Sequence, residues 1–235
     1  MLVGDKVYEG RTKILYNTAD PDLYRLYFKD EATAFGKRRG AIAEKGVYNA
    51  QISTILFTLL SEAGIPNHYR EKIGERVLLV KKLVMYPLII VVRNAVAGSL
   101  APRLGLEEGF QLLEPVVEYY YKREGADNPL LNESHLNTLG FISAGRLQTC
   151  SILALQTNLL LRNYFAHRGL LLVDFKLEFG LADEKVFLGD EISPDTCRLW
   201  DVGTGEKLDK DRFRWDMGGV EEAYREVVER LLGQV

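Results

Sequence analysis

Three charged residues lie at alternate positions in a strongly apolar segment, LLLVDFKLEFG, at residues 170–180. They are Asp174, Lys176 and Glu178. Side chains of a β-strand alternate between two faces, so a strand here would place all three charges on one face. Buried charges are costly unless they are paired or bound to a metal, so this pattern predicts a binding surface. The alternative is a solvated face with a Lys–Glu pair. The opposite face would consist of Val173, Phe175, Leu177 and Phe179.

A second acidic segment, LADEKVFLGDEISPD, follows directly and is expected to pair antiparallel with the first. If Glu184 lies at the centre of the turn, Glu178 falls opposite Asp190, and the two carboxylates meet beside Lys176. The sequence does not fix this register, and a slip of one residue would separate the two carboxylates. The favourable register suits Mg²⁺, which proteins usually hold with one or two carboxylates plus substrate phosphates.

Near the N-terminus, the segment YEGRTK combines a glycine with two cations. Gly10 permits a close backbone approach, and Arg11 and Lys13 would share a strand face able to grip phosphate. Taken alone, a solvated strand edge explains this pattern better.

A second cationic group lies in VVRNAVAGSLAPRLG, where Arg93 is expected at a strand end. Gly98 and Ser99 are placed to open a short helix, whose N-terminus would attract an anion. An ordinary helix cap is the simpler explanation in isolation. Arg198, in SPDTCRLWD, follows the proposed metal site closely and lies in the kind of loop that often has a functional role.

Periodicity and turn residues predict the elements that position these groups. The sequence is typical of an α+β protein with a strand-rich N-terminal third and two lobes, and clefts between lobes commonly bind ligands. The expected elements are a hairpin at 6–16 and 23–29, a helix at 46–63, strands at 76–84 and 88–93, a helix begun by Ser143 and running to about His167 before Gly169, a hairpin at 170–179 and 186–191, and a final helix at 220–232.

Composition excludes several classes. The chain has 235 residues, is 47% hydrophobic and has a net charge of −3, so no basic excess indicates a nucleic-acid partner. The longest apolar run, 83–92, is too short to span a membrane, and the N-terminus lacks an apolar signal core. Two distant cysteines, Cys150 and Cys197, indicate free thiols in a reducing cytoplasm. His68, His135 and His167 show no metal-ligand spacing.

Five segments, taken together and in order, identify a family. They are YEGRTK (8–13), VVRNAVAGS (91–99), VDFKLEFG (173–180), GDEISPDTCRLWD (189–201) and KLDKDRFR (207–214). From about Tyr8 to Arg230 the chain resembles the SAICAR synthetase family. That family joins the carboxylate of carboxyaminoimidazole ribonucleotide (CAIR) to the amine of L-aspartate, using ATP and Mg²⁺, in purine biosynthesis. The resemblance also implies a homodimer.

The resemblance implies a fold and a set of site residues. Residues 1–84 would form an antiparallel-sheet lobe similar to a kinase N-lobe, and 85–235 a larger α/β lobe, with ATP between them. Lys13 and Lys176 would be catalytic. The ATP site would comprise Arg11, Thr12, Lys13, Lys81, Leu83, Glu178 and Asp190, the last two also holding Mg²⁺. Arg93, Ser99 and Arg198 would bind CAIR, chiefly its 5′-phosphate, and Lys210 and Arg214 would be weaker contacts for anionic substrates.

The chain departs from the family at two places. Arg11 stands where the family usually has Lys, which keeps the charge but changes the donor geometry. The loop at 32–46 is one residue short, since Phe35 is followed directly by Gly36, and a polar side chain usual in the family is missing. The basic run after it, Lys37, Arg38 and Arg39, is expected to be solvated rather than to attract substrate.

Three functions compete: the ATP-dependent ligase, a small-molecule kinase on a similar scaffold, and a non-enzymatic nucleotide-binding regulator. Aspartate-dependent release of ADP in the presence of CAIR separates the first from the others. A ligase of this kind must crowd three anionic substrates together, which requires cations such as those above. No residue in the sequence stands out as the base that deprotonates aspartate.

Overall fold

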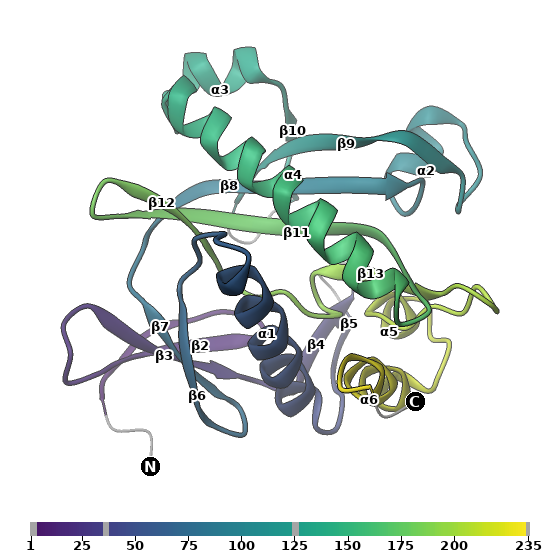
Figure 1. Ribbon diagram of the computed structural model, residues 1–235, viewed down its shortest axis with the longest axis horizontal. Helices are drawn as coiled ribbons and strands as arrows, with labels where there is room; N and C mark the ends of the chain where they lie inside the picture. The colour runs from purple at the N-terminus through teal and green to yellow at the C-terminus, as the bar shows by residue number, and fades with distance from the viewer. Residues whose placement is uncertain (1–3, 35–37, 124–126, 234–235) are drawn as a thin grey trace.

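The computed structural model describes residues 4–34, 38–123 and 127–233. Within these ranges the chain forms a mixed α+β fold in which all the paired strands of the sheets run antiparallel (Figure 1). A five-stranded sheet and a six-stranded sheet make up most of the β-structure. The segment 35–37, which includes the Phe35–Gly36 departure and Lys37, lies outside the described residues.

The five-stranded sheet contains the N-terminal strands in the order β1-β2-β3-β7-β6. Its strands are β1 (Lys6–Glu9), β2 (Lys13–Asn17), β3 (Leu23–Phe28), β6 (Tyr69–Gly74) and β7 (Val77–Lys81). The strand expected at 6–16 is interrupted by a turn, in which the Gly10 amide donates to the Lys13 carbonyl at 2.8 Å. Arg11 therefore lies exposed in the turn, and the prediction that it shares a strand face with Lys13 is wrong.

The six-stranded sheet has the order β10-β9-β8-β11-β12, and β13 also pairs with β11. Its strands are β8 (Val84–Ala95), β9 (Gln111–Tyr121), β10 (Leu130–Leu131), β11 (Leu170–Ala182), β12 (Lys185–Gly189) and β13 (Cys197–Asp201). The long helix α4 (Ala144–Ala166) packs across β8, β11 and β12 (Figure 1). β11 is thus central, with β8, β12 and β13 hydrogen-bonded to it.

The helix α1 (Lys45–Glu62) links the two sheets, since it contacts β3, β6 and β7 as well as α4 and α6 (Val220–Leu231). The helices expected at 46–63, 143–167 and 220–232 are confirmed as α1, α4 and α6. The remaining elements are β4 (Glu31–Ala34), β5 (Arg38–Ala41), α2 (Leu100–Leu104), α3 (Glu133–Leu139) and α5 (Asp211–Arg214).

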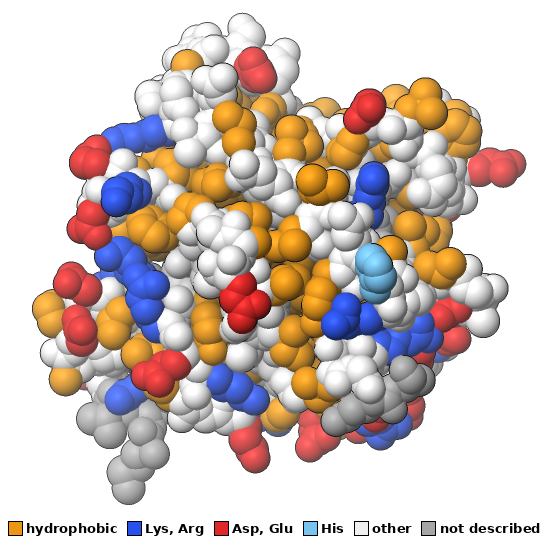
Figure 2. Space-filling view, viewed as in Figure 1, with side chains coloured by type: hydrophobic (Ala, Val, Ile, Leu, Met, Phe, Trp, Pro, Cys, Tyr) orange, Lys and Arg blue, Asp and Glu red, His pale blue; other side chains and the backbone are white. Residues whose placement is uncertain are grey.

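The main core lies between α4, α1 and one face of the six-stranded sheet. The helix α4 exposes Ile152, Leu155 and Leu159 to solvent. Figure 2 shows apolar side chains gathered across the middle of the face on which α4 lies. Among the described residues, no helix has the length and apolar character needed to cross a membrane.

A β-bulge in β11 changes which side chains share a face. The register with β13 shifts between Leu172 and Asp174. Phe175 packs in the main core, whereas Val173 packs with Ala97 and Trp200 in a separate cluster. The prediction that Val173 shares a face with Phe175, Leu177 and Phe179 is therefore wrong, while the other three pack together as expected.

A buried polar cluster holds α1 and α6 against the loop after β12. The carboxylate of Asp195 accepts hydrogen bonds from Lys45 Nζ at 2.8 Å and from the Tyr224 hydroxyl at 2.7 Å. Lys45 begins α1 and Tyr224 lies in α6, and both side chains are fully buried. Burial and the Asp195 charge raise the pKa of Tyr224 well above its ordinary value, so its hydroxyl remains a donor.

We predict that Tyr224→Phe destabilises the fold, because it removes a donor from a buried carboxylate. A hydrogen bond to a charged group contributes about 1.5–3 kcal/mol, and the free energy of unfolding from urea titration should fall by about this amount. Tyr164→Phe is the control: the Tyr164 hydroxyl donates to the neutral Leu231 carbonyl at 3.3 Å, and its loss should cost less than about 1.5 kcal/mol. Equal losses in the two variants would contradict the anchoring role of Asp195.

Candidate active site

The hairpin of β11 and β12 turns through two residues, not three. Ala182 pairs with Lys185, and the turn residues Asp183 and Glu184 have φ values of 49° and 58°. Two successive left-handed residues are the geometry of a tight two-residue hairpin. Glu178 consequently pairs with Gly189, and the prediction that it lies opposite Asp190 is wrong by one residue.

Asp190 nevertheless belongs to the same charged group as Lys13. It lies directly after the end of β12 and has a φ of 59°. Its carboxylate contacts Lys13 Nζ, which also donates to Glu191 at 2.7 Å. Burial would lower the pKa of Lys13, but Asp190 and Glu191 outweigh it and raise the pKa above its ordinary value. Burial likewise opposes ionisation of Asp190, but Lys13 and Lys176 hold its pKa well below the usual range.

The other carboxylate of this group, Glu178, is buried and accepts a hydrogen bond from Lys122 Nζ at 2.5 Å. Burial lowers the pKa of Lys122, whereas Glu178 and Asp190 raise it to a value above the ordinary one. Both carboxylates, and the charge of Lys13, act on the pKa of Lys122. Glu178, Asp190 and Lys13 therefore belong to one site. Lys122 could not be predicted as a site residue from the sequence, because it directly follows an aromatic segment and belongs to no motif.

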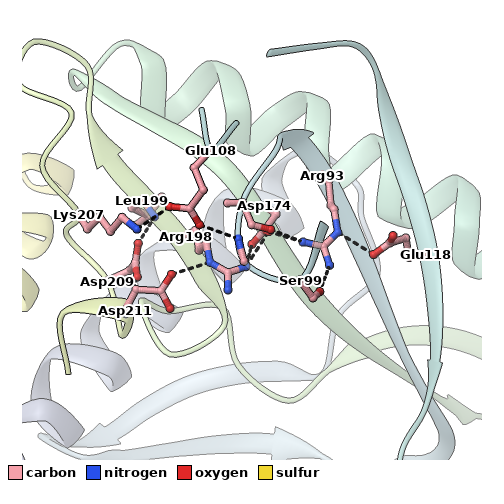
Figure 3. Close-up of polar contacts among 12 residues, drawn as sticks. Arg93, Ser99, Glu108, Glu118, Asp174, Arg198, Leu199, Lys207, Asp209 and Asp211 are labelled. Atoms are coloured by element: carbon pink, nitrogen blue, oxygen red, sulfur yellow. Dashed lines mark hydrogen bonds and ion pairs between the residues drawn. The ribbon is translucent and has the colours of Figure 1, made fainter. Parts of the chain in front are cut away.

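Arg93 is the centre of a second group at the other end of β11 (Figure 3). The guanidinium is buried and donates to Glu118 at 2.6 Å and to Asp174 at 2.7 Å. It also donates to the Ser99 hydroxyl at 3.2 Å and to the Tyr120 hydroxyl at 3.3 Å. The structure thus brings Arg93 and Ser99 together as expected, and Ser99 directly precedes the short helix α2.

Arg198 completes this second group, and it lies on the strand β13, so the prediction that it lies in a loop is wrong (Figure 3). It donates to both oxygens of Asp174, at 3.0 and 2.7 Å, and to Asp211 at 2.7 Å. Asp211 also accepts from Arg214 at 2.5 Å. Burial lowers the pKa of Arg198, but Asp174 and Asp211 outweigh it and raise the pKa, so the side chain remains a cation.

Gly98 provides the space that the Arg198 guanidinium occupies. A Cβ atom on Gly98 would lie 2.4 Å from Arg198 Nη2, and the residue has a φ of +56°, which favours glycine. The Gly98 amide donates to Glu108 at 2.9 Å. The backbone before α2 therefore lies directly against the arginine.

The other residues expected to contact the nucleotide lie outside the first group, which consists of Lys13, Lys122, Glu178 and Asp190. Lys81 donates to Asp183 at 2.7 Å, and the Thr12 carbonyl accepts the Lys29 amide at 2.8 Å. Leu83 packs over the hairpin, since a Cβ atom on Gly180 would lie 2.8 Å from the Leu83 Cβ.

Glu178 and Asp190 fit a hard divalent cation. Both supply carboxylate oxygens, which are the ligands that Mg²⁺ prefers, and each is paired with a lysine. Mg²⁺ needs only one or two carboxylates when phosphates provide the other ligands. Within the described parts of the chain, no cluster of three or more His, Cys, Asp or Glu side chains is arranged to hold a metal, so a complete protein cage is absent there.

Cations paired with carboxylates near both ends of one strand are suited to phosphate-bearing anionic ligands. Comparison with known proteins agrees. The SAICAR synthetase family model matches residues 6–231. The phosphoribosylaminoimidazole-succinocarboxamide synthase of Desulfitobacterium hafniense is 51% identical over 229 residues, which cover 97% of this chain and 96% of that protein.

Solved structures show the same likeness. The crystal structure of the synthase of that name from Ehrlichia chaffeensis has a TM-score of 0.95 and 41% identity, covering 97% of this chain and 98% of the other. A SAICAR synthetase (Type-2) in complex with ADP has a TM-score of 0.94 and 47% identity, with the same coverage of the two chains. The chain belongs to the SAICAR synthetase family.

Asp209, next to the second group, is a buried carboxyl that accepts no hydrogen bond from a cation of the described residues. It accepts from the backbone amides of Leu199 at 3.0 Å and Asp211 at 2.7 Å. Burial, and then the charge of Asp211, raises its pKa from 3.8 to about 7. Because the folded state binds this proton more tightly than the unfolded chain, the stabilisation is complete below the ordinary pKa and is lost as the pH rises through about 7.

We therefore predict that Asp209→Asn, which cannot titrate, changes the pH dependence of stability. The thermal midpoint of the variant relative to the natural protein should rise as the pH is raised from about 5 to about 8. A constant difference across this range would contradict the shifted pKa, whatever the size of that difference, because the loss of a hydrogen-bond acceptor alone is independent of pH.

Proposed function

We propose that this chain is an ATP-dependent carbon–nitrogen ligase that joins the carboxylate of CAIR to the amine of L-aspartate, giving SAICAR, ADP and phosphate. Membership of the family favours this ligase over a kinase or a binding regulator. The observation that supports it best is the arrangement along β11: Asp174 accepts from two arginines near one end, Glu178 accepts from Lys122 near the other, and Lys176 lies between them. Four residues of strand separate the ends by roughly 13 Å.

ATP would bind between an N-terminal lobe of residues 1–84, similar to a kinase N-lobe, and a lobe of residues 85–235. In support, the β7 strand of the first sheet ends at Lys81 and the β8 strand of the second begins at Val84. Lys13 reaches from the first sheet to Asp190 beside the second. The ADP complex of a relative with 47% identity supports nucleotide binding here too.

The roles within the ATP site follow from these positions. Lys13 would contact the phosphates together with Arg11 and Thr12 of the preceding turn, and Lys81 and Leu83 would border the adenine. Glu178 and Asp190 would hold Mg²⁺, which would neutralise charge on the β- and γ-phosphates. Lys176 would neutralise the charge between the nucleotide and the carboxylate that attacks it.

CAIR would bind at the opposite end, with its 5′-phosphate held by Arg93, Ser99 and Arg198. The two guanidinium groups share Asp174, so they are already oriented before a ligand arrives. Lys210, on whose pKa Lys176 acts, and Arg214, which shares Asp211 with Arg198, would be weaker contacts for the anionic substrates.

The chemistry requires the CAIR carboxylate to become an electrophile. Its oxygen would attack the γ-phosphorus of ATP, the bond to ADP would break, and an acyl phosphate would form; the aspartate nitrogen would then displace phosphate. The protein's contribution is to position the groups and to neutralise charge in a site protected from water. Lys13, Lys176 and Arg93 would supply fixed positive charge for these steps.

Assembly and location are part of the same proposal. A homodimer follows from the family resemblance, and the apolar side chains exposed on α4 offer a surface that a second copy would cover. Cys150 and Cys197 are free and buried, which is typical of the reducing cytoplasm. A net charge of −3 gives no basis for a nucleic-acid partner.

An omission assay tests the proposed function. ADP release and SAICAR formation should require ATP, CAIR and L-aspartate together, and each omission should reduce both to background. ADP release that continues undiminished without aspartate would indicate a kinase. Tight ADP binding without any turnover would indicate a regulator, and either result would contradict the proposal.

We predict that Gly98→Ala weakens CAIR binding selectively, because its Cβ would displace the Arg198 guanidinium. A lost hydrogen bond to a charged group corresponds to about tenfold or more in affinity. Gly105→Ala is the matched control, since Gly105 has a φ of +65° but its Cβ would meet nothing within 4 Å. Calorimetry should show weaker CAIR binding only in Gly98→Ala, with ATP affinity kept; unchanged CAIR affinity would contradict the phosphate site.

A further inference from the structure

One lysine of the site, Lys210, lies next to Lys176 in the fold. The Lys210 amide donates to the Pro194 carbonyl at 3.1 Å, and the Lys176 amide donates to the Thr196 carbonyl at 2.9 Å. The loop that holds Asp195 therefore connects the backbones of both lysines. Lys210 is thus adjacent to the middle of β11, between the two ends of the site.

Among the described residues, Lys210 has no carboxylate within hydrogen-bond distance. Its Nζ lies 3.7 Å from Asp195 Oδ2, which is too far for a hydrogen bond. Both oxygens of that carboxylate already accept from other donors, Lys45 at 2.8 Å and Tyr224 at 2.7 Å. Two lysines therefore share one carboxylate, and Lys210 is the more weakly held of the two.

The surroundings of Lys210 favour its neutral form. Among the charged groups around it, Asp195, Lys45, Lys176 and Arg214 affect its pKa most, and three of these four are cations. Burial lowers its pKa to about 8, Asp195 opposes this in part, and the three cations add to the lowering. A lysine that is desolvated beside other cations can exchange protons near neutral pH.

On the basis of the proposed function, we propose that Lys210 accepts the proton that the ammonium group of L-aspartate must lose before its nitrogen attacks the acyl phosphate. The nitrogen lone pair then forms the bond to the acyl carbon. The bond from that carbon to the phosphate oxygen breaks with its electron pair, and the second proton of the nitrogen leaves with the phosphate. Lys210 afterwards returns its proton to solvent.

The other basic groups of the site are less suited to this step. Lys13 and Lys122 are held in their charged form by Asp190 and Glu178, which raise their pKa values. The Asp195 carboxylate is a weak base, because Lys210 and Lys45 hold its pKa well below the usual range against the effect of burial.

The test separates proton removal from binding by changing the nucleophile. Hydroxylamine is uncharged at neutral pH, so it can capture an acyl phosphate as a hydroxamate without a protein base. Lys210→Arg keeps the positive charge but cannot become neutral, and Lys210→Met removes both charge and base. Lys72→Arg, at an exposed position of β6, is the matched control.

Both Lys210 variants should lose about 10²–10⁴-fold in aspartate-dependent kcat. With saturating ATP and CAIR, Lys210→Arg, which keeps the positive charge that contacts the substrates, should form hydroxamate within about threefold of the natural protein. The rise of kcat with pH through about 8 should be present in the natural protein and in Lys72→Arg, and absent from the Lys210 variants.

Two results would overturn the inference while the proposed function stands. One is aspartate-dependent turnover in Lys210→Arg with the natural rate and pH profile. The other is an equal loss of hydroxamate and SAICAR formation in both variants, which would place Lys210 in substrate binding or phosphoryl transfer. Failure of the natural protein to form SAICAR would instead overturn the proposed function, and this inference with it.

Discussion

The carboxylate of Asp174 accepts hydrogen bonds from two arginines on the strands that flank β11, Arg93 on β8 and Arg198 on β13. All three side chains are removed from most solvent contact, so none tolerates the loss of its partners; breaking such a pair typically costs about 3–5 kcal/mol. Correct pairing of the three strands and correct assembly of the arginine pair are therefore the same event. The phosphate-binding end of the site is formed by folding and does not wait for a ligand.

The same constraint operates along the rest of β11. Glu178 is buried and is matched by Lys122 from the end of β9, while Asp190 is matched by Lys13 from the other sheet. Each internal charge thus requires a partner from a different element, and these pairs hold the two sheets and the hairpin in one arrangement. In the proposed reaction, substrate phosphates would pair with the lysines, and Mg²⁺ would pair with the carboxylates. The ion pairs that stabilise the free protein therefore also hold these side chains in position for anionic ligands.

The sequence predicted those parts of the molecule that depend on local patterns. Strand alternation placed Asp174, Lys176 and Glu178 on a charged face, and helical periodicity located α1, α4 and α6 closely. It failed where a local deviation changes the geometry. The two left-handed residues Asp183 and Glu184 moved the hairpin register by one, and the bulge after Leu172 turned Val173 to the other face.

Partners distant in sequence could not be predicted either. Lys122 lies 56 positions from Glu178, and Lys45 lies 150 positions from Asp195. Neither lysine belongs to a local motif, and only the pairing of the strands and the packing of α1 bring them to their carboxylates. The strand β9 was missed because Glu114 and Pro115 interrupt its apolar run. The short helix after Ser99, by contrast, was visible from Gly98 and its neighbours.

The central claim is that this site activates a carboxylate by phosphoryl transfer. The direct test labels the reacting carboxylate of CAIR with heavy oxygen and follows the complete reaction with ATP and L-aspartate. Mass spectrometry should then find one labelled oxygen in inorganic phosphate and none in the nucleotide product, because the oxygen that attacks the γ-phosphorus leaves with it. Label in AMP would show that the carboxylate attacks the α-phosphorus, and unlabelled phosphate with SAICAR still formed would exclude phosphoryl transfer to the carboxylate; either result would contradict the account.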